Sequence, residues 1–449
     1  MATIGDDCKS ILDSVMANAT AKLLAPLKQQ MDEESPADDE TPVPEEEVEW
    51  ISDALEVIKI HFIQTVGQME ASEGYAPLFT NQHFEKEEIF GYKDLKVDLY
   101  YSACSMFLYP KITFSQCSKD VITSREPDDI LILLKNQLPN WHMGMLIENF
   151  SEFEVELRKQ VEVVPVSPLI SRFTKGDKTF AIFKPPSQSC NRESLYITRL
   201  QSLALFYIEA ANYTDNEDPR CETYILYETV ESAHSKEASF FAAGYCTLFN
   251  FYHYPDQVRP RIAQFLLFGP YRGLGAGPEL LSRLSTDIIS SNNVFDITAE
   301  DPCDFFIYTR DFVNCQNLFQ TEEFSKEKVV QGFSKDMMEM AQKRFGISKK
   351  DCRRSYEILR YNYTDVNNVD EFKNFRIEVK RSLSKSHMKK PKEIERIAYM
   401  AQNDKTFAPA LQAEQPAMKF PKLQGLFEKV IQEYGAVLNR LKRFVPEFD

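Results

Sequence analysis

The sequence predicts an α+β protein whose main sheet is mixed and mostly antiparallel, and two regions carry this prediction. Between residues 160 and 300, short apolar runs alternate with polar turns, as in an antiparallel meander. Residues 326–445 instead place apolar side chains at helical spacing. We therefore expect a sheet-rich centre followed by a mostly helical C-terminal region.

Local patterns then predict the individual elements. Val- and Ile-rich runs predict strands at 54–63, 95–101, 179–184, 222–227, 240–252, 259–268 and 294–299. Apolar spacing near 3.6 predicts helices at 1–30, 128–138, 193–212, 278–290, 302–312 and 422–444. The rest of the stretch up to residue 160 is apolar but irregular. The last helix carries an apolar stripe that either folds back on this chain or docks a partner.

Composition limits the classes of protein. The chain has 449 residues, room for two or three domains, and 43% of them are apolar, enough for a sizeable core. Lys and Arg number 52 against 68 Asp and Glu, and the resulting net charge of −16 argues against general DNA binding and favours a basic partner. No run of about 18 apolar residues occurs, so we expect no transmembrane helix and no membrane partner.

Cysteine and histidine spacing argues against a metal site. The nine cysteines form no CxxC pair, which favours reduced thiols in the cytosol or nucleus over disulfides or a zinc site. The six histidines form no spaced set with Asp or Glu, so we expect no metal. Asp6 and Asp7 stand where a signal peptide would carry Lys or Arg.

The acidic segment 31–49 marks the first domain boundary, because it holds ten acids and three prolines without a Lys or Arg. Self-repulsion and low apolar content predict a disordered linker, with an arm for a basic partner as the alternative. The predicted parts are a disordered acidic segment (1–49), an N-terminal α/β domain (50–160), the sheet-rich domain (161–325), a C-terminal helical domain (326–390) and a basic, helical tail (391–449).

The segment 264–281 (QFLLFGPYRGLGAGPELL) carries the clearest chemical signal. An apolar strand leads into three alternate glycines, and a helix opens with Pro278. Glycines free the turn of side chains, so several backbone N–H groups can converge on one anion beside the positive end of the helix. The pattern predicts a phosphate site, with a plain glycine-rich loop as the alternative.

Two better-known phosphate loops fit this segment poorly. A P-loop needs Lys and then Ser or Thr after its last glycine, and Pro278-Glu279 stands there instead. A dinucleotide-binding turn needs G-x-G-x-x-G early in a βαβ unit, whereas this G-x-G-x-G follows a meander late in the chain. Asp296, about 20 residues on, is the one feature that favours the dinucleotide reading.

The turn resembles the Q/R-x-x-G-x-G/A loop of GCN5-related N-acetyltransferases (GNAT), which holds the pyrophosphate of acetyl-coenzyme A (acetyl-CoA); here it reads Arg272-x-x-Gly275-x-Gly277. Residues 250–264 (NFYHYPDQVRPRIAQ), 295–302 (FDITAEDP) and 354–360 (RSYEILR) resemble the type B histone acetyltransferase catalytic subunit. The resemblance runs from about residue 50 to 383 and implies that the sheet-rich domain is a GNAT acetyltransferase core.

The resemblance implies acetyl transfer from acetyl-CoA to lysine ε-amines in the N-terminal tail of newly synthesised histone H4, by direct attack. The attacking amine must first lose a proton, because its ordinary pKa is near 10.4. The implied catalytic carboxylates are Glu300, the general base, with Glu209 and Asp301. We expect Glu209 to end an apolar helix in a partly buried position. Without the resemblance, all three would be read as solvated carboxylates at element ends.

The resemblance also assigns binding residues. The implied cofactor-binding residues are Phe265, Leu266, Leu267, Arg272, Gly273, Leu274, Gly275, Ala276, Gly277 and Phe312. The implied substrate-binding residues are Glu85, Lys86, Glu87, Phe249, Asn250 and Phe251. Acids and aromatic rings suit a cationic peptide, but Lys86 interrupts the acids, and Cys221 stands where relatives can carry Trp. Core packing is the alternative role for Phe312 and for the side chains of residues 265–267.

The resemblance also implies a partner and a location, and two alternative functions stay open. The family works with a WD-repeat histone-binding protein, so we expect one here, and a location in nucleus and cytoplasm. One rival is a histone escort that has kept the fold and lost the chemistry. The other is an acetyltransferase for small amines or other proteins.

Overall fold

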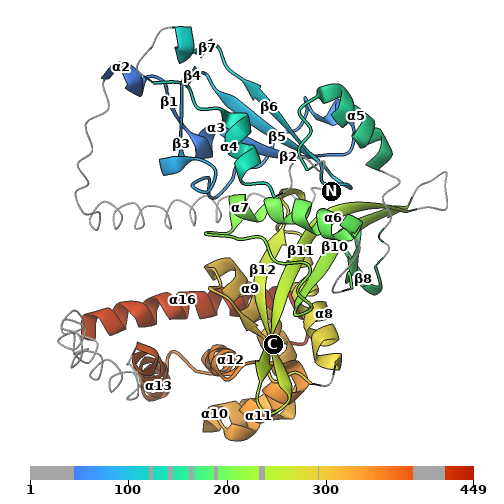
Figure 1. The fold of residues 1–449 in the computed structure, drawn as a ribbon. Helices are drawn as coiled ribbons and strands as arrows, with labels where there is room; N and C mark the ends of the chain where they lie inside the picture. Colours follow the sequence, from blue (N-terminus) through green and yellow to red (C-terminus); the bar gives the residue numbers. More distant parts are fainter. Residues whose placement is uncertain are drawn as a thin grey trace, which may run out of the picture. The chain divides into compact units, whose positions relative to one another are not determined.

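The computed structural model describes residues 45–120, 125–139, 145–160, 165, 167–186, 191–231, 238–291, 293–387 and 420–448. The predicted helix 1–30, most of the acidic segment and the start of the tail lie outside these residues. The chain forms two compact units. The first comprises Met1–Phe251 and Pro260–Leu284, and the second Tyr252–Arg259 and Ser285–Asp449. Figure 1 labels the helices and strands and colours them from the N-terminus to the C-terminus.

The first unit begins with a small mixed sheet of three strands. Its strands are β2 (Ile58–Ile63), β5 (Lys96–Ser102) and β6 (Leu108–Thr113), in the order β2-β5-β6. β2 runs parallel to β5, and β6 antiparallel to it. Two-residue and three-residue strands form two further pairs: β1 (Ile51–Asp53) with β3 (Glu88–Phe90), and β4 (Tyr92–Lys93) with β7 (Gln116–Cys117).

Four helices accompany these strands: α2 (Glu45–Val48), α3 (Ala54–Val57), α4 (Ile130–Asn136) and α5 (Phe150–Lys159). The strand predicted at 54–63 is wrong in its first part, because the Asp53 carboxylate accepts a 2.8 Å hydrogen bond from Leu55 N and starts the helical turn α3. α5 was not predicted. Its buried residues Phe153 and Leu157 pack against Ile63 and Tyr100.

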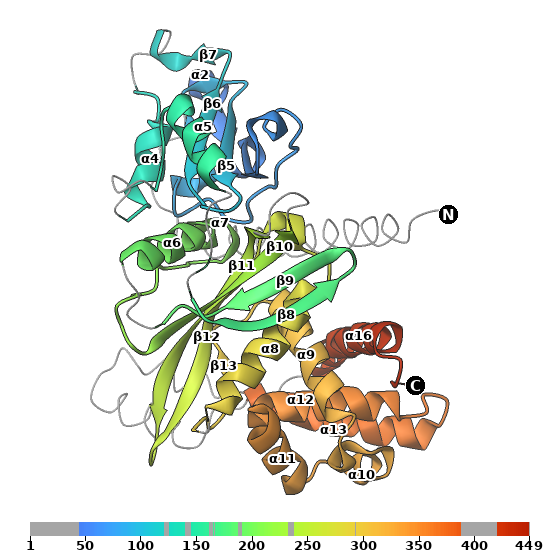
Figure 2. The same ribbon diagram turned by 90° about the vertical axis from the view of Figure 1, so that its right-hand side faces the viewer.

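The main sheet of the first unit confirms the α+β prediction. Its strands follow the order β12-β11-β10-β9-β8. They are β8 (Leu169–Lys175), β9 (Lys178–Phe183), β10 (Cys221–Glu231), β11 (Ala238–His253) and β12 (Gln257–Leu267). The neighbours from β8 to β11 pair antiparallel. β11 bulges at Ala243, because Leu226 pairs with Gly244 and Tyr227 with Ala242. Figure 2 shows the length of these strands.

Two helices precede β10, and one follows β12: α6 (Asn191–Ser202), α7 (Ala204–Tyr207) and α8 (Ala276–Ser290). The single helix predicted at 193–212 is wrong, since it breaks at Leu203 and ends at Tyr207. Ala242 N donates a 2.8 Å hydrogen bond to Ala103 O, and the Tyr101 and Ser202 hydroxyls lie 3.1 Å apart. The first bond joins the small sheet to the main sheet, and the second joins it to α6, all within the first unit.

The second unit is mostly helical, as predicted. Its elements are β13 (Thr298–Ala299), α9 (Asp304–Leu318), α10 (Lys326–Gln331), α11 (Lys335–Phe345), α12 (Lys349–Asn362), α13 (Val369–His387) and α16 (Phe420–Phe444). The strand predicted at 294–299 shrinks to β13 and one bridge between Val294 and Val258. α16 packs on α9, α12 and α13, so its apolar stripe folds back on this chain.

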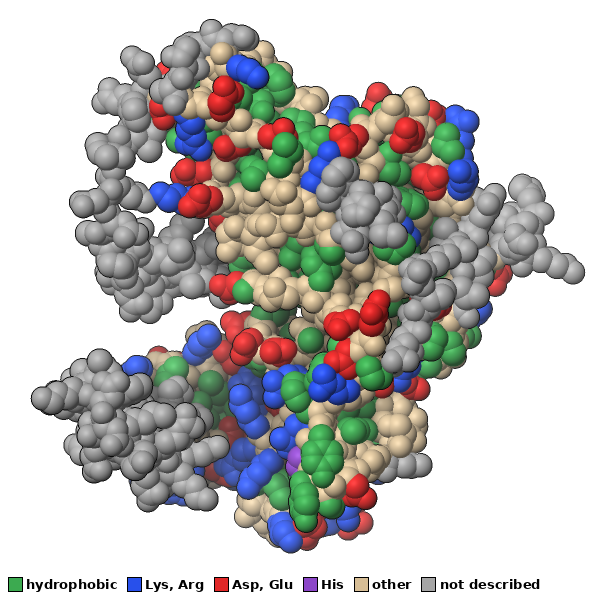
Figure 3. All heavy atoms as spheres, viewed as in Figure 1, with side chains coloured by type: hydrophobic (Ala, Val, Ile, Leu, Met, Phe, Trp, Pro, Cys, Tyr) green, Lys and Arg blue, Asp and Glu red, His purple; other side chains and the backbone are tan. Residues whose placement is uncertain are grey.

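Side chains reinforce this helical packing. Tyr434 and Leu441 of α16 are fully buried. Lys and Arg side chains gather on the helices of this unit (Figure 3), so the acid surplus of the chain is not spread evenly. Within the described ranges, no helix has both the length and the apolar character that a membrane span requires.

Candidate active site

The glycine turn joins β12 to α8 through η6, the short 3-10 helix Gly269–Tyr271. Gly273 and Gly275 have φ values of 78° and 83°, in the left-handed region that side chains disfavour. A Cβ added to Gly275 would meet nothing nearer than the Lys175 side chain at 3.9 Å. Backbone conformation, and not lack of space, therefore requires glycine at position 275.

Two further glycines allow close approach of the backbone. A Cβ on Gly277 would lie 3.3 Å from Leu267 Cδ1, so α8 starts against the end of β12. A Cβ on Gly244 of β11 would lie only 2.4 Å from Leu266 O. β12, which carries the predicted cofactor-binding residues Phe265–Leu267, is thus held tightly on both sides.

The turn offers hydrogen-bond donors. Within the part of the chain that the structure describes, no group accepts a hydrogen bond from the backbone N–H of Gly273, Leu274 or Gly275. The first N–H groups of α8 follow directly, and they lack partners inside the helix. Free amides and a helix N-terminus together favour an anion, so this donor set fits the diphosphate of the predicted cofactor.

Arg272 adds a cation to this turn. Its Nε donates a 2.9 Å hydrogen bond to Leu267 O, and its guanidinium lies 4.2 Å from the Tyr207 ring centroid. No carboxylate among the described residues pairs with it. Burial lowers the pKa of Arg272, and the neighbouring Tyr207 and Tyr75 oppose this shift. Arg272 is half-buried, and a partly buried cation without a carboxylate partner is unusual, since charges withdrawn from water are normally paired.

The predicted catalytic carboxylates belong to different units: one lies in the first unit and two in the second. Glu209 follows α7 in the first unit and is exposed, so the partly buried position expected at a helix end is wrong. Glu300 and Asp301 directly follow β13 in the second unit and are also exposed. Asp301 has a φ of 29°. The three carboxylates are therefore not gathered within either unit.

The remaining cofactor residues divide between the units. Leu266 is buried, and Phe265 and Leu267 on either side of it are half-buried. Phe312 lies in α9 of the second unit, where its buried ring sits 4.5 Å from the Arg440 guanidinium of α16. That contact gives Phe312 a packing role in the helical unit.

The predicted acidic loop forms the 3-10 helix η2 (Glu85–Glu87), in which Lys86 and Glu87 have left-handed φ values of 55° and 60°. The Glu87 carboxylate accepts hydrogen bonds from the Thr80 backbone N–H at 2.9 Å and the Thr80 hydroxyl at 3.3 Å. Glu85 and Lys86 are exposed. Glu87 therefore shapes the loop, while Glu85 presents its carboxylate to solvent.

The predicted aromatic segment lies on β11. The Phe249 and Phe251 rings share a face, with centroids 4.6 Å apart. Guanidinium groups cover both rings, Arg220 at 4.6 Å from Phe249 and Arg261 at 4.5 Å from Phe251. Asn250 is turned to the other face, where its amide donates to Glu222 at 2.9 Å.

Cys221 stands directly opposite Phe249 in the pairing of β10 with β11. The thiol thus adjoins the aromatic pair. A Cys side chain leaves more room beside Phe249 than a Trp at this position would.

α7 connects the acidic loop to the glycine turn. The His83 ring stacks on Phe206 at 4.4 Å, and Phe206 O accepts hydrogen bonds from Leu78 N at 2.8 Å and Phe79 N at 3.1 Å. Burial lowers the pKa of His83 to about 4, so the ring is neutral. The ring of the adjacent residue, Tyr207, contacts the Arg272 guanidinium. Sequence reasoning missed these aromatic contacts, because residues so far apart leave no local pattern.

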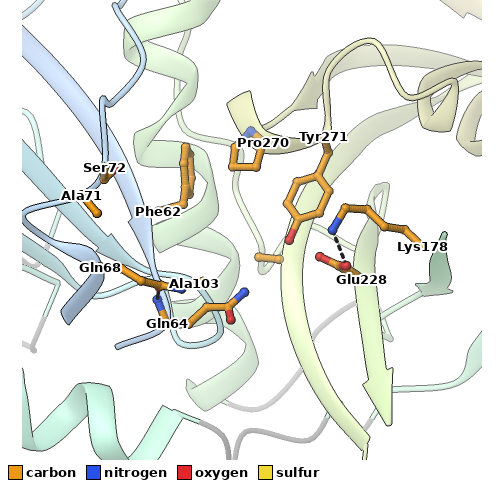
Figure 4. Close-up of a pocket in the computed structure, with 11 residues that line it drawn as sticks. Phe62, Gln64, Gln68, Ala71, Ser72, Ala103, Lys178, Glu228, Pro270 and Tyr271 are labelled. Atoms are coloured by element: carbon orange, nitrogen blue, oxygen red, sulfur yellow. Dashed lines mark hydrogen bonds and ion pairs between the residues drawn. The ribbon is translucent and has the colours of Figure 1, made fainter. Parts of the chain in front are cut away.

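A pocket of about 290 Å³ lies beside η6, and no predicted site residue lines it. Figure 4 shows Lys178 and Glu228, joined by a 2.5 Å ion pair, on one wall with Tyr271, and Gln64 on the other. Burial and the neighbouring Glu228 raise the pKa of Tyr271. The charges of this pocket are internally paired, unlike the charge of Arg272.

The described residues also show how the His, Cys, Asp and Glu side chains are grouped. No group of three or more His, Cys, Asp or Glu among them could hold a metal ion. Their seven cysteines are all free.

Comparisons with known proteins identify the chain. Residues 50–209 match the family described as histone acetyl transferase HAT1 N-terminus, and residues 310–361 match the histone acetyltransferase type B catalytic subunit, C-terminal. The human histone acetyltransferase type B catalytic subunit is 31% identical over 82% of this chain and 87% of its own length. A relative with that name in Dictyostelium discoideum is 25% identical over 76% of this chain and 73% of its own.

A solved structure of an aminoglycoside acetyltransferase from a soil metagenome aligns with a TM-score of 0.21 and 9% identity, over 27% of this chain and 78% of that one. Similarity at that level does not define the fold. The relatives do define the class: the chain is an acetyltransferase that acts on histones. More specifically, it belongs to the family of histone acetyltransferase type B catalytic subunits.

Proposed function

We propose that this enzyme transfers the acetyl group of acetyl-CoA to lysine ε-amines in the N-terminal tail of newly synthesised histone H4. The observation that carries the proposal is the turn between β12 and α8. There, Arg272 has no counter-ion among the described residues, and it precedes two left-handed glycines whose amides are free. Such a turn is built for an anionic group, and acetyl-CoA carries a diphosphate.

The residues of the turn divide the work of binding. The backbone N–H groups of residues 273–277 and the Arg272 guanidinium hold the diphosphate. The backbone of Phe265–Leu267 aligns the pantetheine arm along β12, and an N–H there polarises the thioester carbonyl. Bound acetyl-CoA supplies an acetyl group activated as a thioester.

The carboxylates remove the proton from the substrate lysine. A lysine side chain arrives as an ammonium and can attack only after it loses a proton. Glu300 takes that proton as general base, directly or through a water, and Glu209 and Asp301 assist. The amine nitrogen then bonds to the acetyl carbon, and the coenzyme leaves as the thiol.

The variant Glu300→Gln tests the base. General-base catalysis contributes about 10²- to 10⁴-fold, so kcat at neutral pH should fall by that factor while calorimetric affinity for acetyl-CoA stays within about twofold. Glu327→Gln, an exposed carboxylate on α10, is the matched control and should keep full activity. Wild-type turnover in Glu300→Gln would reject Glu300 as the base.

A substrate panel tests the acceptor. An H4 tail peptide, a peptide of equal charge and scrambled order, and spermidine are compared by kcat/KM. The proposal expects the H4 peptide to be preferred. A preference for spermidine would support an acetyltransferase of small amines instead. Failure of calorimetry to detect acetyl-CoA binding would favour the histone escort.

We further propose a WD-repeat histone-binding partner and a location in both nucleus and cytoplasm, because the resemblance implies both. Affinity purification of the full chain with mass spectrometry tests the partner, and fractionation with immunoblotting tests the location. Recovery without any WD-repeat protein, or signal in one compartment alone, would reject the corresponding part.

A further inference from the structure

The guanidinium of Arg272 lies against a tyrosine ring. Its Cζ is 4.2 Å from the Tyr207 ring centroid, which is close enough for a strong cation–π contact. Tyr207 is buried, and within the described chain its hydroxyl has no hydrogen-bond partner. Packing therefore holds the ring, and the face of the ring makes the cation–π contact with Arg272.

A second tyrosine, Tyr75, pairs with Ile60 of β2 and packs close to the glycine turn. The Tyr75 ring packs on Gly269 so closely that a Cβ there would lie 2.4 Å from Tyr75 Cγ. Burial raises the pKa of Tyr75, and the charge of Arg272 partly offsets the rise, which marks the two groups as electrostatic neighbours. Gly269 begins η6, three residues before Arg272.

The backbone holds Tyr75 firmly. Tyr75 N donates to Ile60 O at 2.8 Å, and Ile60 N donates to Tyr75 O at 2.9 Å. Gly74, with a φ of 68°, has its Cα against the buried His61, since an added Cβ would lie 2.7 Å from His61 Cε1. His61 in turn contacts the Ser72 hydroxyl at 2.9 Å and Asp98 at 3.0 Å. The segment 72–75 is thus anchored to β2 and β5.

We propose that Tyr207 and Tyr75 are positioning residues for the Arg272 guanidinium, which they keep ready for the cofactor diphosphate: Tyr207 through its ring face, and Tyr75 through its packing on Gly269, three residues before Arg272. Arginine loses rotamer freedom when it binds an anion, and a preset side chain avoids that cost. Nε is already bound to Leu267 O, so the Nη groups of the same fork remain for an anion. The N-terminal region thereby contributes to cofactor affinity without touching the cofactor. This inference rests on the proposed acetyl-CoA site.

The test compares two acetyl donors, acetyl-CoA and S-acetylpantetheine, which lacks the diphosphate. Tyr207→Leu, which loses the ring face under Arg272, should raise KM for acetyl-CoA about tenfold. Tyr75→Leu, which loses the packing on Gly269, should also raise this KM, and kcat should stay within about twofold of wild type in both variants. Tyr207→Phe and Tyr75→Phe keep the ring and should retain the wild-type KM. With S-acetylpantetheine, all four variants should match the wild type.

Three results would overturn the inference. An unchanged KM for acetyl-CoA in both Leu variants would remove the positioning role and leave the proposed site intact. An equal loss with both donors would indicate general damage to the fold. A wild-type enzyme that uses both donors equally well would overturn the diphosphate site itself. Because Tyr75 is 38% exposed, Tyr75→Leu carries the test if the buried Tyr207→Leu does not fold.

Discussion

Arg354 of α12 donates a 2.6 Å hydrogen bond from Nε to the carboxylate of Asp311 on α9. Its Nη2 also donates to Glu433 of α16 at 2.8 Å. Asp311 is fully buried, and in the described structure its Oδ1 has no hydrogen-bond partner. One arginine thus joins three helices of the second unit, and the docking of α16 depends on polar bonds as well as on its apolar stripe.

Replacing Arg354 should destabilise the second unit. Arg354→Met leaves the Asp311 carboxylate buried and unpaired, which costs about 3–5 kcal/mol. We expect a lower midpoint of thermal unfolding and faster proteolysis around α16. Lys442→Met, an exposed cation on the same helix, is the control and should change neither. Equal stability of the two variants would show that apolar packing alone holds α16.

Asp311 should also make stability depend on pH. Burial raises its pKa to about 6, and Arg354 and Arg310 oppose the rise. Because this value lies above the ordinary 3.9, the folded state binds more protons than the unfolded state between pH 4 and 6. The stabilisation is fully present below about pH 4 and is lost as pH rises through 6, by about 2–3 kcal/mol.

Thermal unfolding of the wild type and of Asp311→Asn from pH 4 to 8 measures this dependence. Wild-type stability should fall relative to the variant up to about pH 7 and then stay level. Asp351 and Cys315 also adjoin Asp311 and are present in both proteins. A constant difference across the range would mean that Asp311 titrates normally.

Gly244→Ala should damage the main sheet. The new Cβ would lie 2.4 Å from Leu266 O, and two paired strands cannot separate without losing hydrogen bonds, so we expect a loss of about 3 kcal/mol. Gly435→Ala provides the contrast, because α16 leaves open space there and a helical Ala should add about 1 kcal/mol. Denaturant unfolding should therefore give opposite signs, and a neutral Gly244→Ala would contradict the close approach.

Gly275→Ala should weaken acetyl-CoA binding with little loss of stability. The left-handed φ of 83° costs alanine about 1–2 kcal/mol, which the turn can relieve by changing shape. We expect affinity for acetyl-CoA to fall about tenfold by calorimetry. Gly176→Ala is the control, because Gly176 in the β8–β9 hairpin has a left-handed φ of 59° and open space around it. This variant introduces a similar backbone strain at a position outside the glycine turn. Equal affinities in the two variants would remove the turn from the cofactor site.

Glu85→Gln and Glu87→Gln should act differently. Glu85 is exposed, so its loss should raise KM for an H4 peptide about threefold at low salt and leave stability unchanged. The Glu87 carboxylate is bonded to Thr80, so its loss should loosen the loop and lower stability by about 1 kcal/mol. Peptide kinetics at 50 and 300 mM salt measure the change in KM, and thermal unfolding measures the change in stability. If Glu85→Gln and Glu87→Gln change KM and stability alike, the two glutamates do not have separate roles.

The sequence predicted the elements whose signals are local. Alternation predicted β9 to β12, helical spacing predicted α8 and α16, and alternate glycines predicted the turn and its donors. α5 was missed although its signal is present: the Asn149 side chain caps the helix by accepting from Ser151 N at 2.8 Å, and Glu152 stands at the third helical position.

The missed parts of the site depend on contacts between distant residues. Tyr207 contacts Arg272, and Tyr75 packs on Gly269 three residues before it, only because separate elements meet in the fold. Single aromatic residues in the sequence give no sign of these contacts. The exposure of Glu209 could not be predicted either, since the helix ends at Tyr207, two residues before it. Local patterns predict backbone conformation well, whereas pairing of side chains requires the assembled fold.

The division of the chain into two units has a practical consequence for dissecting this enzyme. Residues 252–259 belong to the second unit although the chain on both sides of them belongs to the first. The polypeptide crosses the boundary at 251/252, 259/260 and 284/285. No single cleavage or stop codon can therefore liberate either half intact, and a fragment ending at residue 251 would lack the whole of β12. Separate production of the halves would require joining residues 1–251 to 260–284 for the first unit and residues 252–259 to 285–449 for the second.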